Sequence, residues 1–150
     1  MTGWRWAVGI VLLLHGIGHL LALIPLFKAE LVSGWNLRSW LLTDAIGEGA
    51  AKGVGAVLFT GSTVVFILAG LAVLGWGVPG GWWMPLAVAG AIASTVALVL
   101  FWNAFPFLVP NKVGALAVNI IILGNWAGVW DWPSQSMLGN QTAQAVRTIT

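Results

Sequence analysis

The chain has 150 residues, of which 59% are hydrophobic and only 7% are charged. Soluble domains carry about a quarter of their residues as charged side chains, so six basic and four acidic residues cannot coat a water-facing surface. This composition excludes a soluble enzyme and a disordered chain. A formal net charge of +2 is too small for a nucleic-acid surface. The absence of cysteine excludes disulfides, iron–sulfur clusters and thiol catalysis.

Four charge-free apolar stretches are long enough to cross a bilayer, whose core of about 30 Å needs roughly 20 helical residues. Each is expected to be helical, because an unpaired backbone group in hydrocarbon is costly. The first is read as a retained span, because it is too long for a secretory signal and no small-residue cleavage site follows. The predicted spans are residues 6–27, 54–76, 82–105 and 113–130. The sequence therefore predicts an all-α, four-transmembrane-helix antiparallel bundle within residues 1–132 and a polar tail over 133–150.

The connections between the spans differ in kind. Residues 77–81, Gly-Val-Pro-Gly-Gly, form a tight-turn signal that predicts a close hairpin of the second and third spans. The loop 28–53 holds more than half of the charged residues, yet its apolar residues recur at roughly helical spacing. That pattern predicts an amphipathic helix in the headgroup region, between the first two spans. The apolar residues are Leu37, Trp40, Leu41, Leu42 and Ile46.

The tryptophans give an independent check, because this side chain prefers the membrane–water interface. Four spans group the eleven tryptophans into two belts at opposite faces. The larger belt contains Trp4, Trp6, Trp76, Trp82, Trp83, Trp126, Trp130 and Trp132, and the smaller one Trp35, Trp40 and Trp102. The positive-inside rule slightly favours both termini outside. It compares Lys28, Arg38, Lys52 and Lys112 with Arg5 and Arg147.

His15 and His19 are the only histidines and lie four residues apart in the first span, on one helix face. Such a pair can share a transition metal ion, although two ligands do not complete a site. Asp44 and Glu48, also four apart, are the candidate further ligands if their segment folds back over the bundle. The sequence therefore predicts a metal site of these four residues.

Other interpretations of the two histidines stay open. Neutral imidazoles can simply bond Asn, Ser or Thr on another helix, or they can serve a proton or ion relay. Haem or chlorophyll ranks below a metal ion, because two histidines on one face of one helix cannot sandwich a haem. Asp44 and Glu48 can equally be solvated charges, with Glu48 and Lys52 forming a helical ion pair.

Polar and small residues in the other spans predict close helix packing. Asn119 and Asn125 are expected to make interhelical polar contacts, and Ser94 and Thr95 are read the same way. Small residues at spacing four allow backbones to approach closely. These pairs are Ala87 with Ala91, Gly90 with Ser94, and Gly124 with Gly128.

Three segments together carry a resemblance. Residues 12–21 read Leu-Leu-Leu-His-Gly-Ile-Gly-His-Leu-Leu, residues 82–86 Trp-Trp-Met-Pro-Leu, and residues 113–119 Val-Gly-Ala-Leu-Ala-Val-Asn. In these the chain resembles uncharacterised small bacterial four-span membrane proteins with a His-Gly-x-x-His signature in the first transmembrane helix. The resemblance implies the fold and the bacterial cytoplasmic membrane. It implies no activity and no role for the histidines.

Two function classes follow. The first is a non-enzymatic integral membrane protein, an accessory subunit or self-assembling module of a membrane complex, because no complete catalytic set is present. Its partners would be the lipid bilayer and either further copies or a larger complex. The second is a small metal- or cofactor-binding membrane protein, redox or hydrolytic, that uses His15 and His19. Transport is disfavoured, because none of the four spans contains Asp, Glu, Lys or Arg.

Overall fold

A computed structural model describes residues 3–27, 35–105 and 112–129, and all regular structure within them is helical. The main helices are α1 (Gly3–Leu20), α4 (Glu48–Leu74), α5 (Trp83–Leu100) and α6 (Gly114–Trp126). Short helical elements connect them: η1 (Leu21–Leu23), α2 (Ile24–Phe27), α3 (Leu42–Ile46), η2 (Gly80–Trp82) and η3 (Trp102–Ala104). The predicted all-α class is confirmed for these residues.

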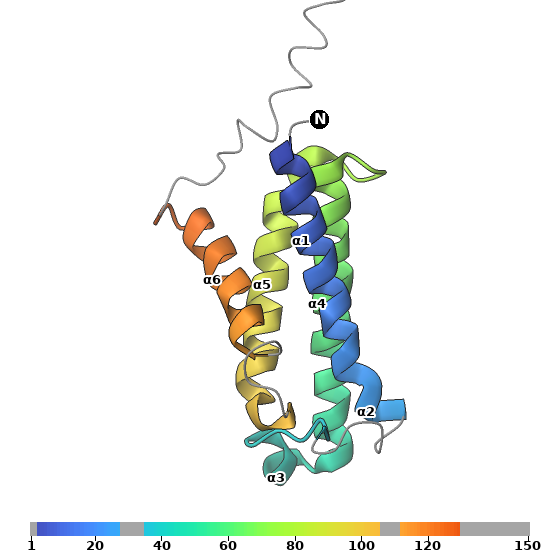
Figure 1. The fold of residues 1–150 in the computed structure, drawn as a ribbon. Helices are drawn as coiled ribbons and strands as arrows, with labels where there is room; N and C mark the ends of the chain where they lie inside the picture. Colours follow the sequence, from blue (N-terminus) through green and yellow to red (C-terminus); the bar gives the residue numbers. More distant parts are fainter. Residues whose placement is uncertain (1–2, 28–34, 106–111, 130–150) are drawn as a thin grey trace, which may run out of the picture.

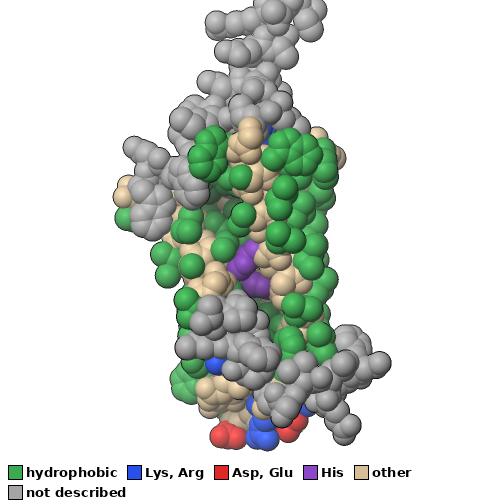
Figure 2. Space-filling model, in the orientation of Figure 1, with side chains coloured by type: hydrophobic (Ala, Val, Ile, Leu, Met, Phe, Trp, Pro, Cys, Tyr) green, Lys and Arg blue, Asp and Glu red, His purple; other side chains and the backbone are tan. Residues whose placement is uncertain are grey.

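Helix α4 is the centre of the arrangement. It packs along α1 on one side and along α5 on another, while α6 lies mainly against α5 (Figure 1). Figure 2 shows hydrophobic side chains along the length of the molecule, with charged side chains gathered at the end near α3. The chain therefore presents a long apolar surface that has one charged end on this face.

Three helical stretches of the described chain are long and apolar enough to cross a membrane: Gly3–Leu26, Glu48–Leu74 and Gly80–Leu100. Helix α6 has 13 residues, a length of about 20 Å at 1.5 Å per residue. This is shorter than the predicted span of residues 113–130, whose last residue lies outside the described chain, as does the tail 133–150. Fourfold crossing therefore stays a prediction.

The first predicted span is a broken helix. Its α-helical pattern changes to the 3₁₀ element η1 before α2 begins at Ile24. Pro25 accounts for the change, because proline has no N–H to continue the α-helical bonding and its ring crowds the preceding turn. The helical path still continues to Phe27, which is the predicted end of the span.

The loop predicted over residues 28–53 is shorter than expected. Helix α4 begins at Glu48, six residues before the predicted start and directly after Gly47, and Glu48 pairs with Lys52 one turn along the helix at 2.7 Å. The predicted amphipathic helix is reduced to the five residues of α3. Two positive φ angles, 49° at Leu37 and 86° at Gly47, prevent a longer helix. Residues 28–34 of this loop lie outside the described chain.

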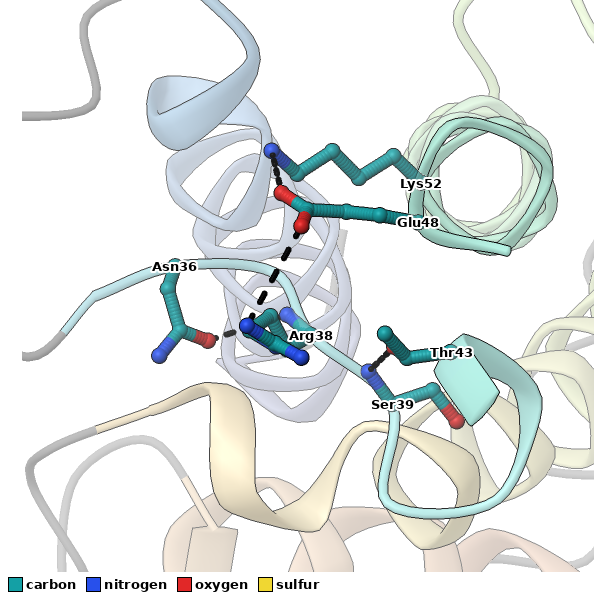
Figure 3. Close-up of polar contacts among 6 residues, drawn as sticks. All are labelled: Asn36, Arg38, Ser39, Thr43, Glu48 and Lys52. Atoms are coloured by element: carbon teal, nitrogen blue, oxygen red, sulfur yellow. Dashed lines mark hydrogen bonds and ion pairs between the residues drawn. The ribbon is translucent and has the colours of Figure 1, made fainter. Parts of the chain in front are cut away.

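Side chains of the segment before α3 bind the end of α5. Ser39 Oγ donates to the Leu100 carbonyl at 2.6 Å, and Trp40 Nε1 donates to the Val99 carbonyl at 2.7 Å. The last carbonyls of a helix lack partners within the helix, so these bonds satisfy groups that would otherwise be unpaired. The Ser39 amide donates to Thr43 Oγ1 at 2.9 Å, which orders the same segment (Figure 3).

The opposite end of the molecule contains the predicted tight turn. Gly75 adopts φ 73° after the last residue of α4, and the Trp76 amide donates to the Leu71 carbonyl at 2.9 Å. Arg5 Nε donates to the Val73 carbonyl at 2.8 Å, and the rings of Trp6 and Trp76 are 5.7 Å apart. The start of α1 is thereby fastened to the end of α4.

Trp83 departs from the predicted belt of interfacial tryptophans. It is 8% exposed and belongs to the core between α4 and α5, whereas Trp4, Trp6, Trp76, Trp82 and Trp126 are exposed. The helical repeat explains the difference, because Trp82 precedes α5 and faces outward while Trp83 begins the helix and turns inward. Trp130 and Trp132 lie outside the described chain.

Glycines bring α1 and α4 into close contact. A Cβ atom added at Gly70 would lie 2.8 Å from Leu13 Cγ and 3.0 Å from the Gly9 carbonyl oxygen. One added at Gly16 would lie 3.1 Å from both Phe66 Cβ and the Thr63 carbonyl oxygen. These distances are shorter than normal carbon contacts, so the two helices can approach this closely only without a side chain at these positions.

We expect Gly70→Ala to lower the free energy of unfolding by about 1–3 kcal/mol, because the added methyl group forces α1 and α4 apart. Gly61→Ala is the matched control on the same helix, since nothing lies within 4 Å of the Cβ position there. The measurement is reversible unfolding in mixed micelles. Equal stability of the two variants would contradict the close-contact interpretation.

Candidate functional site

His15 and His19 lie one helical turn apart on α1, and their ring centroids are 4.7 Å apart. The spacing of four residues thus places both rings on one face, as the sequence predicts. His15 is half-buried and His19 is buried. Both face side chains of the other helices, so their hydrogen-bond partners decide what they can do.

Asn119 is the centre of the polar contacts around the histidines. It is fully buried on α6, and its Oδ1 lies 3.1 Å from His15 Nε2. Its Nδ2 donates to two hydroxyl groups of α5, Ser94 Oγ at 2.8 Å and Thr95 Oγ1 at 3.2 Å. Ser94 Oγ also lies 2.7 Å from His19 Nε2. We call these five side chains the histidine network, and it joins α1, α5 and α6.

The bonds of the histidine network determine where its protons lie. Because Asn119 Nδ2 donates twice, Oδ1 is the amide's acceptor, and His15 must carry a proton on Nε2. Ser94 Oγ accepts from Asn119 and has His19 Nε2 as its only acceptor among the described bonds. The Ser94 proton therefore points to His19, whose own proton is on Nδ1. Both rings satisfy this pattern in the neutral form.

Phenylalanines of α4 support the two rings from the side. The Phe66 ring lies 4.5 Å from that of His15 and 5.8 Å from that of His19, both edge to face. Phe59 lies 6.1 Å from His19. Phe66 and Phe59 are almost completely buried, so these contacts limit how far either imidazole can turn.

A cavity of about 440 Å³ adjoins the histidine network. Both histidines line it, together with apolar residues of α1 and α6 and with Phe59, Leu98 and Phe105. Figure 2 shows the histidine side chains in a hollow between neighbouring helices, visible from the side of the molecule. Helices α1 and α6 hardly touch directly, so the His15–Asn119 bond crosses the space between them.

Asp44 and Glu48 lie elsewhere. Both are exposed at the charged end of the molecule, and Glu48 contacts Lys52 at 2.7 Å and Arg38 at 4.0 Å (Figure 3). No group of three His, Asp or Glu side chains within residues 3–27, 35–105 and 112–129 could hold a metal ion. The four predicted ligands are therefore not brought together. The reason is that the helical path continues past His19 through η1 and α2, which keeps the histidines away from the charged end.

Asn125 and Trp35 lie outside the histidine network. Asn125 lies near the end of α6 and is half-buried. Trp35 lines the cavity, and no pattern in the sequence indicates this, because residues before α3 show only a weak helical periodicity. Its position depends on the chain folding back beneath Phe105, whose ring is 6.2 Å away.

No protein-family model, curated protein or solved structure matches this chain. The resemblance to small bacterial four-span membrane proteins therefore stays a prediction. The geometry of the histidine network and its cavity is the basis for the functional argument.

We expect Asn119→Leu to lower the free energy of unfolding by about 1–3 kcal/mol. The change removes all three bonds of the amide and leaves His15 Nε2 without a partner. Asn103→Leu is the matched control, because Asn103 is exposed and has no hydrogen bond to a described residue; its effect should stay within about 0.5 kcal/mol. The measurement compares the unfolding curves of the two variants in the same detergent. A neutral Asn119→Leu would show that the network does not hold the helices.

Proposed function

We propose that the chain is an integral membrane protein of the bacterial cytoplasmic membrane that crosses the bilayer four times. Within it, α1, α4, α5 and α6 serve as the spans, with both termini on one side. It acts without catalysis, as an accessory subunit or self-assembling module of a membrane complex. The histidine network carries this proposal, because every one of its bonds fastens one helix to another.

The bonding of the histidine network supports a structural role. Asn119, Ser94 and Thr95 use their polar groups on each other, on the histidines or, for Thr95, on the Ala91 carbonyl. In hydrocarbon such bonds join helices and contribute about 0.6 kcal/mol on average. A hydroxyl poised as a nucleophile would instead need a free position beside a bound substrate.

The exposed surface of α1 supports a partner. Only 28% of the most apolar 18 residues of Gly3–Leu26 are buried, compared with 50% in each of the stretches Glu48–Leu74 and Gly80–Leu100. Large apolar side chains cover this face, including Leu14 at 63% and Ile17 at 50% exposure. Lipid or a second helix must cover them, and α1 therefore offers a larger docking face for another subunit than α4 or α5 does.

Extraction of native membranes in a mild detergent tests the proposal. We expect a defined complex by native mass spectrometry, made of several copies or of this chain with other subunits. Ile17→Asn, on the exposed face of α1 and away from the cavity lining, should dissociate it, because the face then carries an unpaired polar group. The matched control is Val57→Asn on α4, which is 73% exposed.

A separate experiment tests whether the chain is an integral membrane protein. An alkaline wash removes peripheral proteins but should leave this chain in the membrane pellet. Release by the wash would contradict the membrane proposal. A chain that resists the wash but is monomeric in every mild detergent would contradict only the subunit role.

The second candidate is a metal or cofactor site on His15 and His19. The observation in its favour is that both rings line the cavity side by side. Among the described residues, no third His, Asp or Glu lies with the two histidines, so further ligands would have to come from other side chains or from the bound group. This candidate predicts that elemental analysis of purified protein shows a stoichiometric transition metal that His15→Ala with His19→Ala removes. Metal-free protein with normal stability would exclude this candidate.

A further inference from the structure

The cavity beside the histidine network has the size and lining of a small-molecule site. Its volume of about 440 Å³ lies within the range of about 300–1,000 Å³ that such sites occupy. Apart from the two histidines and Trp35, apolar side chains form its walls. Apolar walls with few polar groups are typical of sites that bind an apolar molecule and orient it by one head group.

The position of the cavity determines the direction from which a ligand can enter it. His15 lies twelve residues after Gly3, about 18 Å along the axis at 1.5 Å per residue, and His19 lies one turn further. His15 is thus near the middle of the helical path Gly3–Phe27. The hollow in Figure 2 opens sideways, across the helix axes. In the membrane setting proposed above, on which this inference rests, a sideways opening at that depth faces the acyl chains. The ligand must then be soluble in lipid.

The polar groups available to a ligand are the two Nδ1 atoms. The network occupies Nε2 of each histidine, and neither Nδ1 has a hydrogen-bond partner in the described chain. Neither Nδ1 atom is fully buried. Among the described residues, the fully buried side-chain nitrogen or oxygen that lacks a partner is Trp35 Nε1, not an atom of either histidine. From the proton positions derived above, His19 Nδ1 carries a proton and donates, while His15 Nδ1 has a lone pair and accepts. The cavity is thus lined by two rings with centroids 4.7 Å apart, one with a free donor and the other with a free acceptor.

We propose that the cavity binds a lipid-soluble molecule with a hydroxyl head, such as a long-chain phenol or alcohol. The hydroxyl proton is donated to His15 Nδ1, and the hydroxyl oxygen accepts from His19 Nδ1. The apolar body occupies the space between α1 and α6. A hydroxyl group is the smallest head group that can both donate and accept, and each imidazole offers one half of that pair.

Three probes that share one alkyl chain test this inference in nanodiscs. They are 4-decylphenol, which donates and accepts; 4-decylanisole, which only accepts; and decylbenzene, which does neither. We expect the phenol to bind about tenfold more tightly than either other probe, as the loss of a buried hydrogen bond predicts. Affinities are compared as mole fractions in the bilayer. Because the chain has only two histidines, ¹⁵N spectra of histidine-labelled protein should show the two Nδ1 resonances shifting together with the phenol, whereas the anisole can shift that of His19 only.

A pair of variants on α6 locates the binding. Ala115 lines the cavity, whereas Ala117 is exposed and does not. We expect Ala115→Phe to fill the cavity and weaken phenol binding at least tenfold, and Ala117→Phe to leave it unchanged. The probe series uses the unaltered chain, so it decides the question even if Ala115→Phe does not fold.

The outcomes separate the interpretations. Equal binding of the three probes, no binding of any, or phenol binding that Ala115→Phe leaves intact would each overturn the proposal. Tighter binding of diacylglycerol than of the phenol, also lost in Ala115→Phe, would support it and identify a lipid hydroxyl as the source. An alkaline wash that releases the chain would count against the membrane setting, whereas a chain that stays in the membrane but ignores the phenol refutes this inference alone.

Discussion

The pairing of polar groups inside an apolar helix bundle is the constraint on which the rest of the structure depends. Asn119 is completely buried, and an amide in that position is stable only if hydroxyl and imidazole groups arrive from other helices at the right height. One turn of slippage of α6 along α5 would break three bonds together. The histidine network therefore sets the register of helices whose apolar surfaces alone would allow several.

Packing differs on the two sides of α1, and this difference produces the cavity. Toward α4, Gly9, Gly16 and Gly70 allow backbone contact, so α1 lies close to that helix. Toward α6 there is little direct contact, and the His15–Asn119 bond bridges the remaining space. Helix α1 thus packs closely against α4 on one side and borders the cavity on another. A ligand in that space would contact both α1 and α6, which make few contacts with each other.

Polar chemistry is divided between two regions that do not meet. Arg38 and Lys52 both contact the exposed Glu48 at one end, while the histidine network joins neutral hydrogen-bonding groups in the interior. Among the described residues, Trp35 Nε1 is a buried donor without a partner, although the Trp35 ring borders the cavity. An unpaired buried donor is costly, which marks this wall as the part of the interior where polar pairing is incomplete.

The sequence by itself determined the helical class, the tight turn after α4 and the common face of His15 and His19, because apolar runs, glycine at positive φ and a spacing of four act locally. It did not determine where α4 begins, that Trp83 turns inward or that Asp44 and Glu48 stay apart from the histidines. Only the tertiary structure decided these points, and it also chose the partners of Asn119 and placed Trp35 at the cavity. Each depends on contacts between residues distant in the chain, whose packing and hydrogen bonds no local pattern encodes.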